Sequence, residues 1–207
     1  MKFWNLFCGL SAALPCFAMS LRLFTVWKDP LSVDSGGWVR FGVGIMIVEF
    51  LVVHSGGIFG AYAAGRLGGP RYAIFLLPLF YGVFAAVISF AFKNRSLLTY
   101  FAFIMAGRLA AIGVPLLRED AAYLGSRAGV ALVLYMGMVV LTLIPLPRGG
   151  ITPEAAGCSM SGSGSGVWVD YPHRPLLAGA LYFFLLGCAE ILLPFGFFHM
   201  EFSAQAG

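Results

Sequence analysis

The sequence predicts an all-helical, polytopic membrane protein with six transmembrane spans. Of its 207 residues, 60% are hydrophobic and only 11% are charged. A soluble domain averages about 45–50% apolar and roughly 25% charged residues. The apolar residues form long runs, and one helical span needs about 20 of them. Because backbone groups in lipid must be satisfied within the segment, and barrel-like alternation is absent, each run is expected to be a helix.

The first four spans are separated by short polar or turn-rich stretches. The first run ends before Lys28-Asp29-Pro30, and the second ends at Gly68-Gly69-Pro70. The third stops at Lys93-Asn94-Arg95-Ser96, a connection so short that its flanking helices must be antiparallel neighbours. The fourth ends at Arg118-Glu119-Asp120. The complete set of expected spans is 3–24, 38–64, 72–92, 97–117, 128–146 and 176–198.

The only long polar segment, 149–175, lies between the fifth and sixth spans. It contains an alternating Ser-Gly stretch, 161–166, which buries too little to order itself and is typical of a flexible linker. No Lys-Ser or Lys-Thr pair follows, as a phosphate-binding loop would require. The whole chain, 1–207, is therefore expected to be a single integral membrane domain.

The first span has an alternative interpretation as a cleaved signal peptide. Lys2 precedes an apolar run, and cleavage after Ala18 would place small residues at Cys16 and Ala18. The distribution of positive charge favours an uncleaved span with both termini outside the cytoplasm, because the cytoplasmic side then holds seven basic residues rather than five. Those seven are Arg22, Lys28, Arg40, Lys93, Arg95, Arg148 and Arg174.

Three charged residues lie within the predicted spans rather than at their ends. Glu49 and Arg108 lie near the centres of the second and fourth spans, and Glu190 lies slightly past the centre of the sixth. An ion at that depth costs at least about 2.5–3.5 kcal/mol and usually has a partner. We therefore expect a buried Glu49–Arg108–Glu190 cluster, because a planar guanidinium can engage two carboxylates. Its formal charge is −1 unless one carboxylate is protonated.

This cluster has a structural and a functional interpretation. In the first it joins helices, and in the second Glu49, Glu190 and His54 form a proton relay or ion site at the membrane midplane. His54 lies five residues after Glu49, an advance of about 140° around a helix, so the two do not share a face. They could still border one polar cavity.

Small residues predict where helices approach closely. Gly56, Gly60 and Ala64 form a ladder on the second span, with Gly57 beside it, and Gly107 and Ala111 lie close to Arg108 on the fourth. In lipid, helices associate through close packing of such small residues. We expect these two stripes to pack together and to bring Glu49 toward Arg108.

The sequence is compatible with two classes of function. One is a structural or accessory membrane component, and the other is a proton-coupled small-solute transporter or proton-conducting protein. The chain has no recognised catalytic motif or metal-ligand spacing, so a non-enzymatic role without cofactor or metal is favoured. The expected partners are the lipid bilayer of a bacterial inner membrane and, as a further option, other membrane subunits or a second copy of the chain. Nucleic acid is not expected, because basic residues are scattered.

Overall fold

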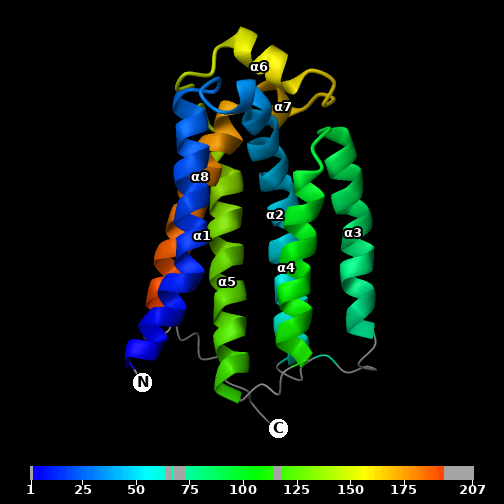
Figure 1. Ribbon diagram of the computed structural model, residues 1–207, viewed down its shortest axis with the longest axis vertical. Coiled ribbons are helices and arrows are strands. Elements are labelled where there is room, and N and C mark those ends of the chain that lie inside the picture. The colour runs from blue at the N-terminus through cyan, green and yellow to red at the C-terminus, as the bar shows by residue number, and fades with distance from the viewer. Residues whose placement is uncertain (1, 64–66, 68–72, 114–117, 194–207) are drawn as a thin grey trace.

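The computed structural model describes residues 2–63, 67, 73–113 and 118–193, and throughout these it contains helices and no strand. The prediction of an all-helical protein is confirmed for these residues. Six helices are long: α1 (Lys2–Lys28), α2 (Gly37–Ala63), α3 (Ala73–Ala91), α4 (Ser96–Gly113), α5 (Arg118–Leu141) and α8 (His173–Leu192). They run alternately up and down in one bundle (Figure 1).

Four of these helices are both long and apolar enough to cross a membrane. The qualifying segments are Gly9–Lys28, Gly37–Tyr62, Ile74–Ala91 and His173–Leu192. The apolar parts of α4 and α5 are shorter, Ser96–Leu109 and Gly125–Leu141. The described chain thus has the helices of an integral membrane protein, with four candidate spans.

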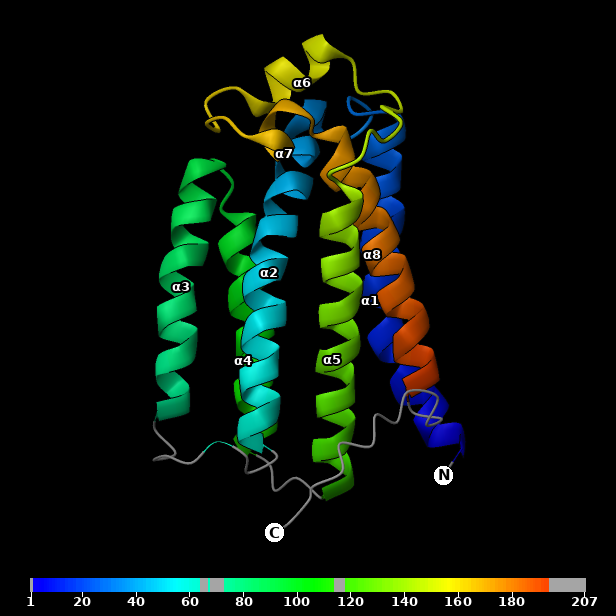
Figure 2. The same cartoon turned by 180° about the vertical axis from the view of Figure 1, so that it is seen from behind.

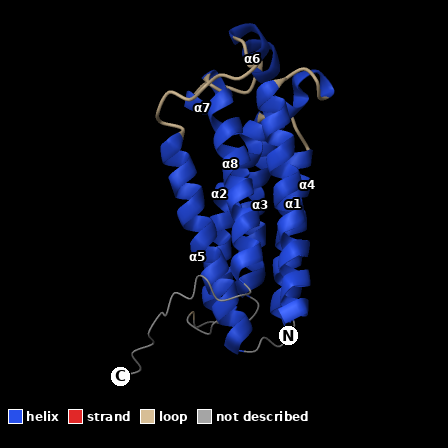
Figure 3. Ribbon diagram, turned by 90° about the vertical axis from the view of Figure 1, so that its left-hand side faces the viewer, coloured by secondary structure: helices blue, strands red, loops and turns tan. Residues whose placement is uncertain are grey.

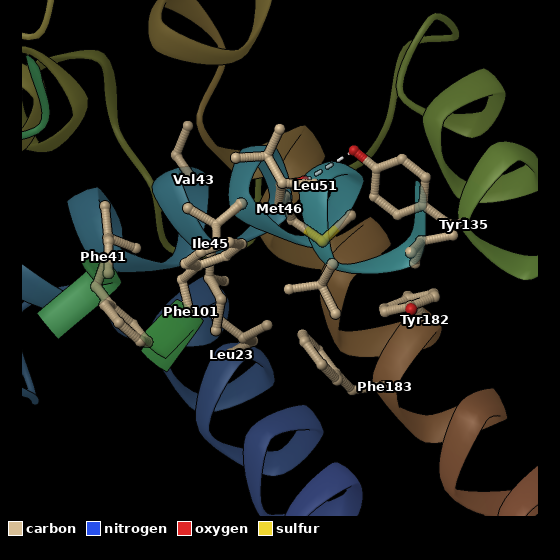
Figure 4. Packing of buried hydrophobic residues seen from close by; sticks show 14 of the residues in the cluster. Leu23, Phe41, Val43, Ile45, Met46, Leu51, Phe101, Tyr135, Tyr182 and Phe183 are labelled. Atoms are coloured by element: carbon tan, nitrogen blue, oxygen red, sulfur yellow. Dashed lines mark hydrogen bonds between the residues drawn. The ribbon is translucent and has the colours of Figure 1, made fainter. Parts of the chain in front are cut away.

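Helix α2 is at the centre of the bundle. It contacts α1, α3, α4, α5 and α8, whereas α3 lies on the outside and packs against α2 and α4 (Figures 1 and 2). Side chains of α2 such as Ile45 and Met46 are fully buried against Leu23 of α1 and Tyr182 of α8 (Figure 4). The Tyr135 hydroxyl of α5 donates to the Met46 carbonyl oxygen at 2.8 Å. The core of the bundle therefore forms around α2.

Helices α1 and α8 make the most extensive helix–helix contact among the described residues. Helix α1 is continuous through Ala18. Gly187 of α8 lies under the Phe17 ring, where an added Cβ would be only 2.8 Å from a ring carbon. The Ser20 hydroxyl donates to the Ala180 carbonyl oxygen at 2.6 Å. The first helix is thus an integral part of the packed bundle.

The long polar segment 149–175 contains two short helices, α6 (Pro153–Met160) and α7 (Val167–Asp170), and the Ser-Gly stretch 161–166 connects them without helical structure. With the 3-10 turn η1 (Asp34–Gly36), these cover one end of the bundle (Figures 1 and 3). Thr152 caps α6 by accepting from the Ala155 N–H at 3.2 Å. Arg40 Nε donates to the Ser159 carbonyl oxygen at 2.9 Å. The cap and the contact with α2 thus hold α6, which lies before the Ser-Gly stretch, in place against the bundle.

The fifth helix also differs from its prediction. It starts at Arg118 instead of residue 128, because the charged run 118–120 begins this helix rather than marking only the end of the fourth span. Arg127, counted in the sequence as a residue outside the span, consequently lies well inside α5. This shift decides which charges meet in the bundle.

Candidate functional site

Polar and charged side chains meet between the helices, both halfway along the bundle and toward the end opposite the one that α6, α7 and η1 cover. We call Glu49, Tyr100, Arg108, Arg127 and Glu190 the polar centre. Glu49 lies halfway along α2 and is 3% exposed. The Tyr100 hydroxyl of α4 donates to Glu49 Oε1 at 2.8 Å, whereas Oε2 is buried without a hydrogen-bond partner. The carboxyl group is therefore only half satisfied.

Arg108 reaches from α4 onto the backbone of α2. Its Nη1 donates to the Val52 carbonyl oxygen at 2.5 Å and to Ser55 Oγ at 2.7 Å. Gly56 makes room for the guanidinium, because an added Cβ there would lie 2.9 Å from Nη2. The small residue on α2 thus admits a charged side chain rather than a neighbouring helix backbone.

Glu190 and Arg127 form an ion pair between α8 and α5. Arg127 Nε lies 2.5 Å from Glu190 Oε1, and the Glu190 side chain is 0% exposed while that of Arg127 is 46% exposed. An ionised group buried to this degree needs a close opposite charge. The pair connects the inside of the bundle with its surface.

The structure arranges the three expected charges differently from the Glu49–Arg108–Glu190 cluster. The described ion pair of Glu190 is with Arg127, and the hydrogen bonds of Arg108 go to α2. Arg108 and Arg127 both act electrostatically on Glu49, so the charges belong to one neighbourhood. Two acids and two arginines sum to zero formal charge instead of −1. Arg127 lies one residue before the predicted start of the fifth span, so hydropathy does not identify it, and the unbalanced charge of the predicted cluster is the signal that points to a further cation.

Cys16 and two tyrosines complete the surroundings of the polar centre. Cys16 of α1 lies within electrostatic reach of Glu49, Glu190 and Arg127. Tyr135 of α5 and Tyr182 of α8 lie within reach of Glu49. Five helices, α1, α2, α4, α5 and α8, therefore contribute to this neighbourhood, and α3 is not among them.

His54 lies outside the polar centre, as its angular offset from Glu49 predicts. Its side chain is exposed on the outer face of α2, and Nδ1 shares a short hydrogen bond with the Tyr81 hydroxyl of α3. The imidazole ring stacks on Phe50. The structure does not bring His54 together with Glu49 and Glu190 in a hydrogen-bonded relay.

The predicted helix-packing residues also have different surroundings. Gly56 lies against Arg108 and Gly60 is buried, whereas Gly57 and Gly107 are exposed, with no atom within 4 Å of an added Cβ. The side chains of Ala64 and Ala111 lie outside the described residues. The two stripes therefore do not form a continuous glycine contact along the described helices.

No group of three His, Cys, Asp or Glu side chains in the described ranges could hold a metal ion. A comparison of the chain with protein-family models, curated proteins and solved structures finds no match. The chemistry of the site must therefore be argued from its geometry. That geometry offers interhelical hydrogen bonds, one ion pair and a buried carboxyl group with a free oxygen.

Proposed function

We propose that this protein is a six-span integral membrane protein of a bacterial inner membrane, formed as one domain, with a structural or accessory role. The observation that carries the proposal is that polar side chains deep in the bundle reach across to other helices. Tyr100 and Arg108 of α4 bond to α2, and Arg127 of α5 pairs with Glu190 of α8. Because lipid provides no hydrophobic force between helices, such contacts and close packing fix their arrangement.

The six-span arrangement is supported by the alternating direction of the long helices. Helices α4 and α5 lie among the four candidate spans, run parallel to them and have apolar stretches of their own. With 24 residues, α5 is about 36 Å long, and a hydrocarbon core is about 30 Å thick. Helix α5 is therefore long enough to cross, and α4, with 18 residues and a length of about 27 Å, comes within a few ångströms of that thickness.

The structural role is tested by comparing Arg108→Leu with the triple variant Glu49→Leu, Arg108→Leu, Glu190→Leu. We expect the single variant to lose more abundance and thermal stability, because it removes a cation near Glu49 and leaves that buried carboxylate in place. Phe103→Leu, an exposed position on the same helix, is the matched control. Wild-type abundance and melting temperature for Arg108→Leu would contradict the proposal.

A second candidate is proton conduction, favoured by the buried and unpartnered Oε2 of Glu49. A carboxyl group at the bilayer centre can take up and release a proton, and intramembrane acids often mark proton paths. Glu190, paired with the half-exposed Arg127, would link the path to the surface of the bundle.

Proton flux into liposomes under a pH gradient tests this candidate. We expect purified wild type to conduct above protein-free liposomes and Glu49→Gln to fall to background. Glu154→Gln is the control, because Glu154 is exposed on α6 outside the bundle. Background flux in the wild-type protein would eliminate the conducting function, and purification with native partners would then identify a complex.

The proposed orientation places the capped end in the cytoplasm, since more Lys and Arg residues lie on that side. Cys158 is an exposed thiol on α6 at this end. A membrane-impermeant maleimide should label it in inverted vesicles and not in intact cells, and Cys158→Ser should lose the label. The opposite pattern of labelling would reverse the orientation.

A further inference from the structure

Helix α2 lies between α3 and α5 on one side of the bundle (Figure 2). Its outer face carries polar and aromatic groups where lipid is expected. We call Phe50, His54 and Gly57 of α2, with Tyr81 of α3, the His54 face. Phe50, His54 and Gly57 are exposed, and Tyr81 is buried beside them. This face takes no part in the polar centre.

The His54 face lies within the hydrocarbon of a membrane that the bundle spans. The candidate span of α2 has 26 residues, Gly37–Tyr62, and is about 39 Å long. His54 is eight residues from its Tyr62 end, which is about 12 Å. A hydrocarbon layer of about 30 Å centred on this span includes the imidazole. Lipid tails at that depth offer no hydrogen bond.

The imidazole is only half satisfied by the protein. Nδ1 shares its hydrogen bond with the Tyr81 hydroxyl, and Nε2 has no hydrogen-bond partner among the described residues. A polar group facing an apolar medium without a partner is costly. The geometry therefore leaves one hydrogen-bonding nitrogen available to a molecule that arrives through the membrane.

The surroundings of that nitrogen favour a flat ring. The Phe50 and His54 rings are stacked, with centroids 5.9 Å apart and planes inclined by 13°. One turn further along, Gly57 leaves open space, since no atom lies within 4 Å of an added Cβ. Phe80 stands edge-on to Tyr81 at 5.4 Å and is itself exposed, which adds an aromatic side on α3.

We propose that the His54 face binds the carbonyl-bearing ring of a membrane-soluble quinone. Such a ring dissolves in the hydrocarbon, stacks on aromatic side chains and presents a carbonyl oxygen to an imidazole N–H. Small-ligand sites of this kind combine apolar and aromatic walls with a few polar groups that fix orientation. Ester carbonyls of phospholipids are less suited, because they lie at the interface and have no ring to stack.

The test uses the full chain in phosphatidylcholine nanodiscs and a photoreactive decyl-benzoquinone. We expect the cross-link to map to peptides of α2 or α3, and unmodified decyl-benzoquinone to compete. His54→Phe keeps a ring but removes the hydrogen bond, so the apparent affinity should fall by about threefold to tenfold. Gly57→Leu fills the open space without touching the His54–Tyr81 bond and should weaken binding at least as much.

Gly107→Leu is the matched control, because Gly107 is equally open but lies on α4, away from this face. It should bind the quinone as the wild type does. Cross-links confined to other helices, or unchanged affinity in both His54→Phe and Gly57→Leu, would overturn the proposal. A wild-type dimer that Gly57→Leu converts to monomer without any effect on quinone binding would overturn it in favour of a second copy of the chain.

Discussion

Helices α2 and α3 are both apolar enough to span a membrane, yet they occupy opposite kinds of position. In α2, 61% of the most apolar stretch is buried, and in α3 only 22% is, although α3 is the more apolar of the two. Lipid tails are as apolar as leucine, so apolarity makes both helices candidates for spanning a membrane without selecting either for the core of the bundle. Hydropathy therefore identifies the solvent of a helix and not its neighbours.

Small and polar residues distinguish the two helices. Gly42 and Gly44 of α2 lie in close contact with leucines of other helices, whereas an added Cβ at Gly82 of α3 has only one neighbour, at 3.9 Å. Helix α2 also carries Glu49, while α3 presents large apolar side chains outward. These exposed residues are Phe75, Leu76, Leu79, Phe80, Val83, Phe84, Val87 and Phe90.

The largest effect on stability is predicted for the Arg127–Glu190 ion pair, in which one partner is buried and the other is half exposed. Arg127→Leu should lower the free energy of unfolding by about 3–5 kcal/mol, because it removes a cation paired with a fully buried carboxylate. Glu190→Leu should cost about 1 kcal/mol or less, since the half-exposed Arg127 can turn its charged end toward water. Equilibrium unfolding in detergent measures both. Equal losses would show that burial of the two partners does not matter.

The next effect compares glycines of α2 and α3 directly. Gly42→Ala should destabilise by about 1–3 kcal/mol, because its Cβ would lie 2.3 Å from Leu176 Cδ2 and 2.8 Å from Leu23 Cδ2. Gly82→Ala meets only Phe101 at 3.9 Å and should be neutral, or should stabilise by up to about 1 kcal/mol through helix propensity. Thermal unfolding of the two variants is the measurement, and a larger drop in melting temperature for Gly82→Ala than for Gly42→Ala would contradict this prediction.

The smallest effect compares two tyrosine hydrogen bonds to α2. Tyr100→Phe should cost about 1–2 kcal/mol, because it leaves Glu49 Oε1 buried without its donor. Tyr81→Phe removes a bond to the exposed His54 and should cost about 0.5 kcal/mol. The difference in melting temperature between the two variants is the measurement. A larger loss at Tyr81 would place the stabilising polar contacts on the outer side of α2.

The succession of the long helices and most of their first residues were predictable from the sequence, because apolar runs and turn residues are local signals. Five of the six helices start within three residues of the prediction. The fifth does not, since charges at 118–120 begin a helix as readily as they end one. The local structure within 149–175 was also unpredictable, because it depends on distant contacts. One of these is the hydrogen bond from Arg40 to the Ser159 carbonyl oxygen, 119 residues apart.

Three residues of the polar centre could be predicted from the sequence, but their partners could not. Depth within a span singles out Glu49, Arg108 and Glu190 without any knowledge of neighbours, because charge is costly there. Their partners depend on which helices face one another. Arg108 turns to the α2 backbone and Glu190 to Arg127, and no local pattern specifies either choice.

The helical class, the apolar segments and the few charges inside them follow from composition and from position along the chain, so they can be read without knowledge of the fold. The tertiary structure alone decided that α2 is central and α3 peripheral, that Arg127 balances the buried acids, and that His54 faces outward. The physical reason is that transfer into lipid depends on each segment separately, whereas ion pairs, close packing and exposure depend on segments far apart in sequence.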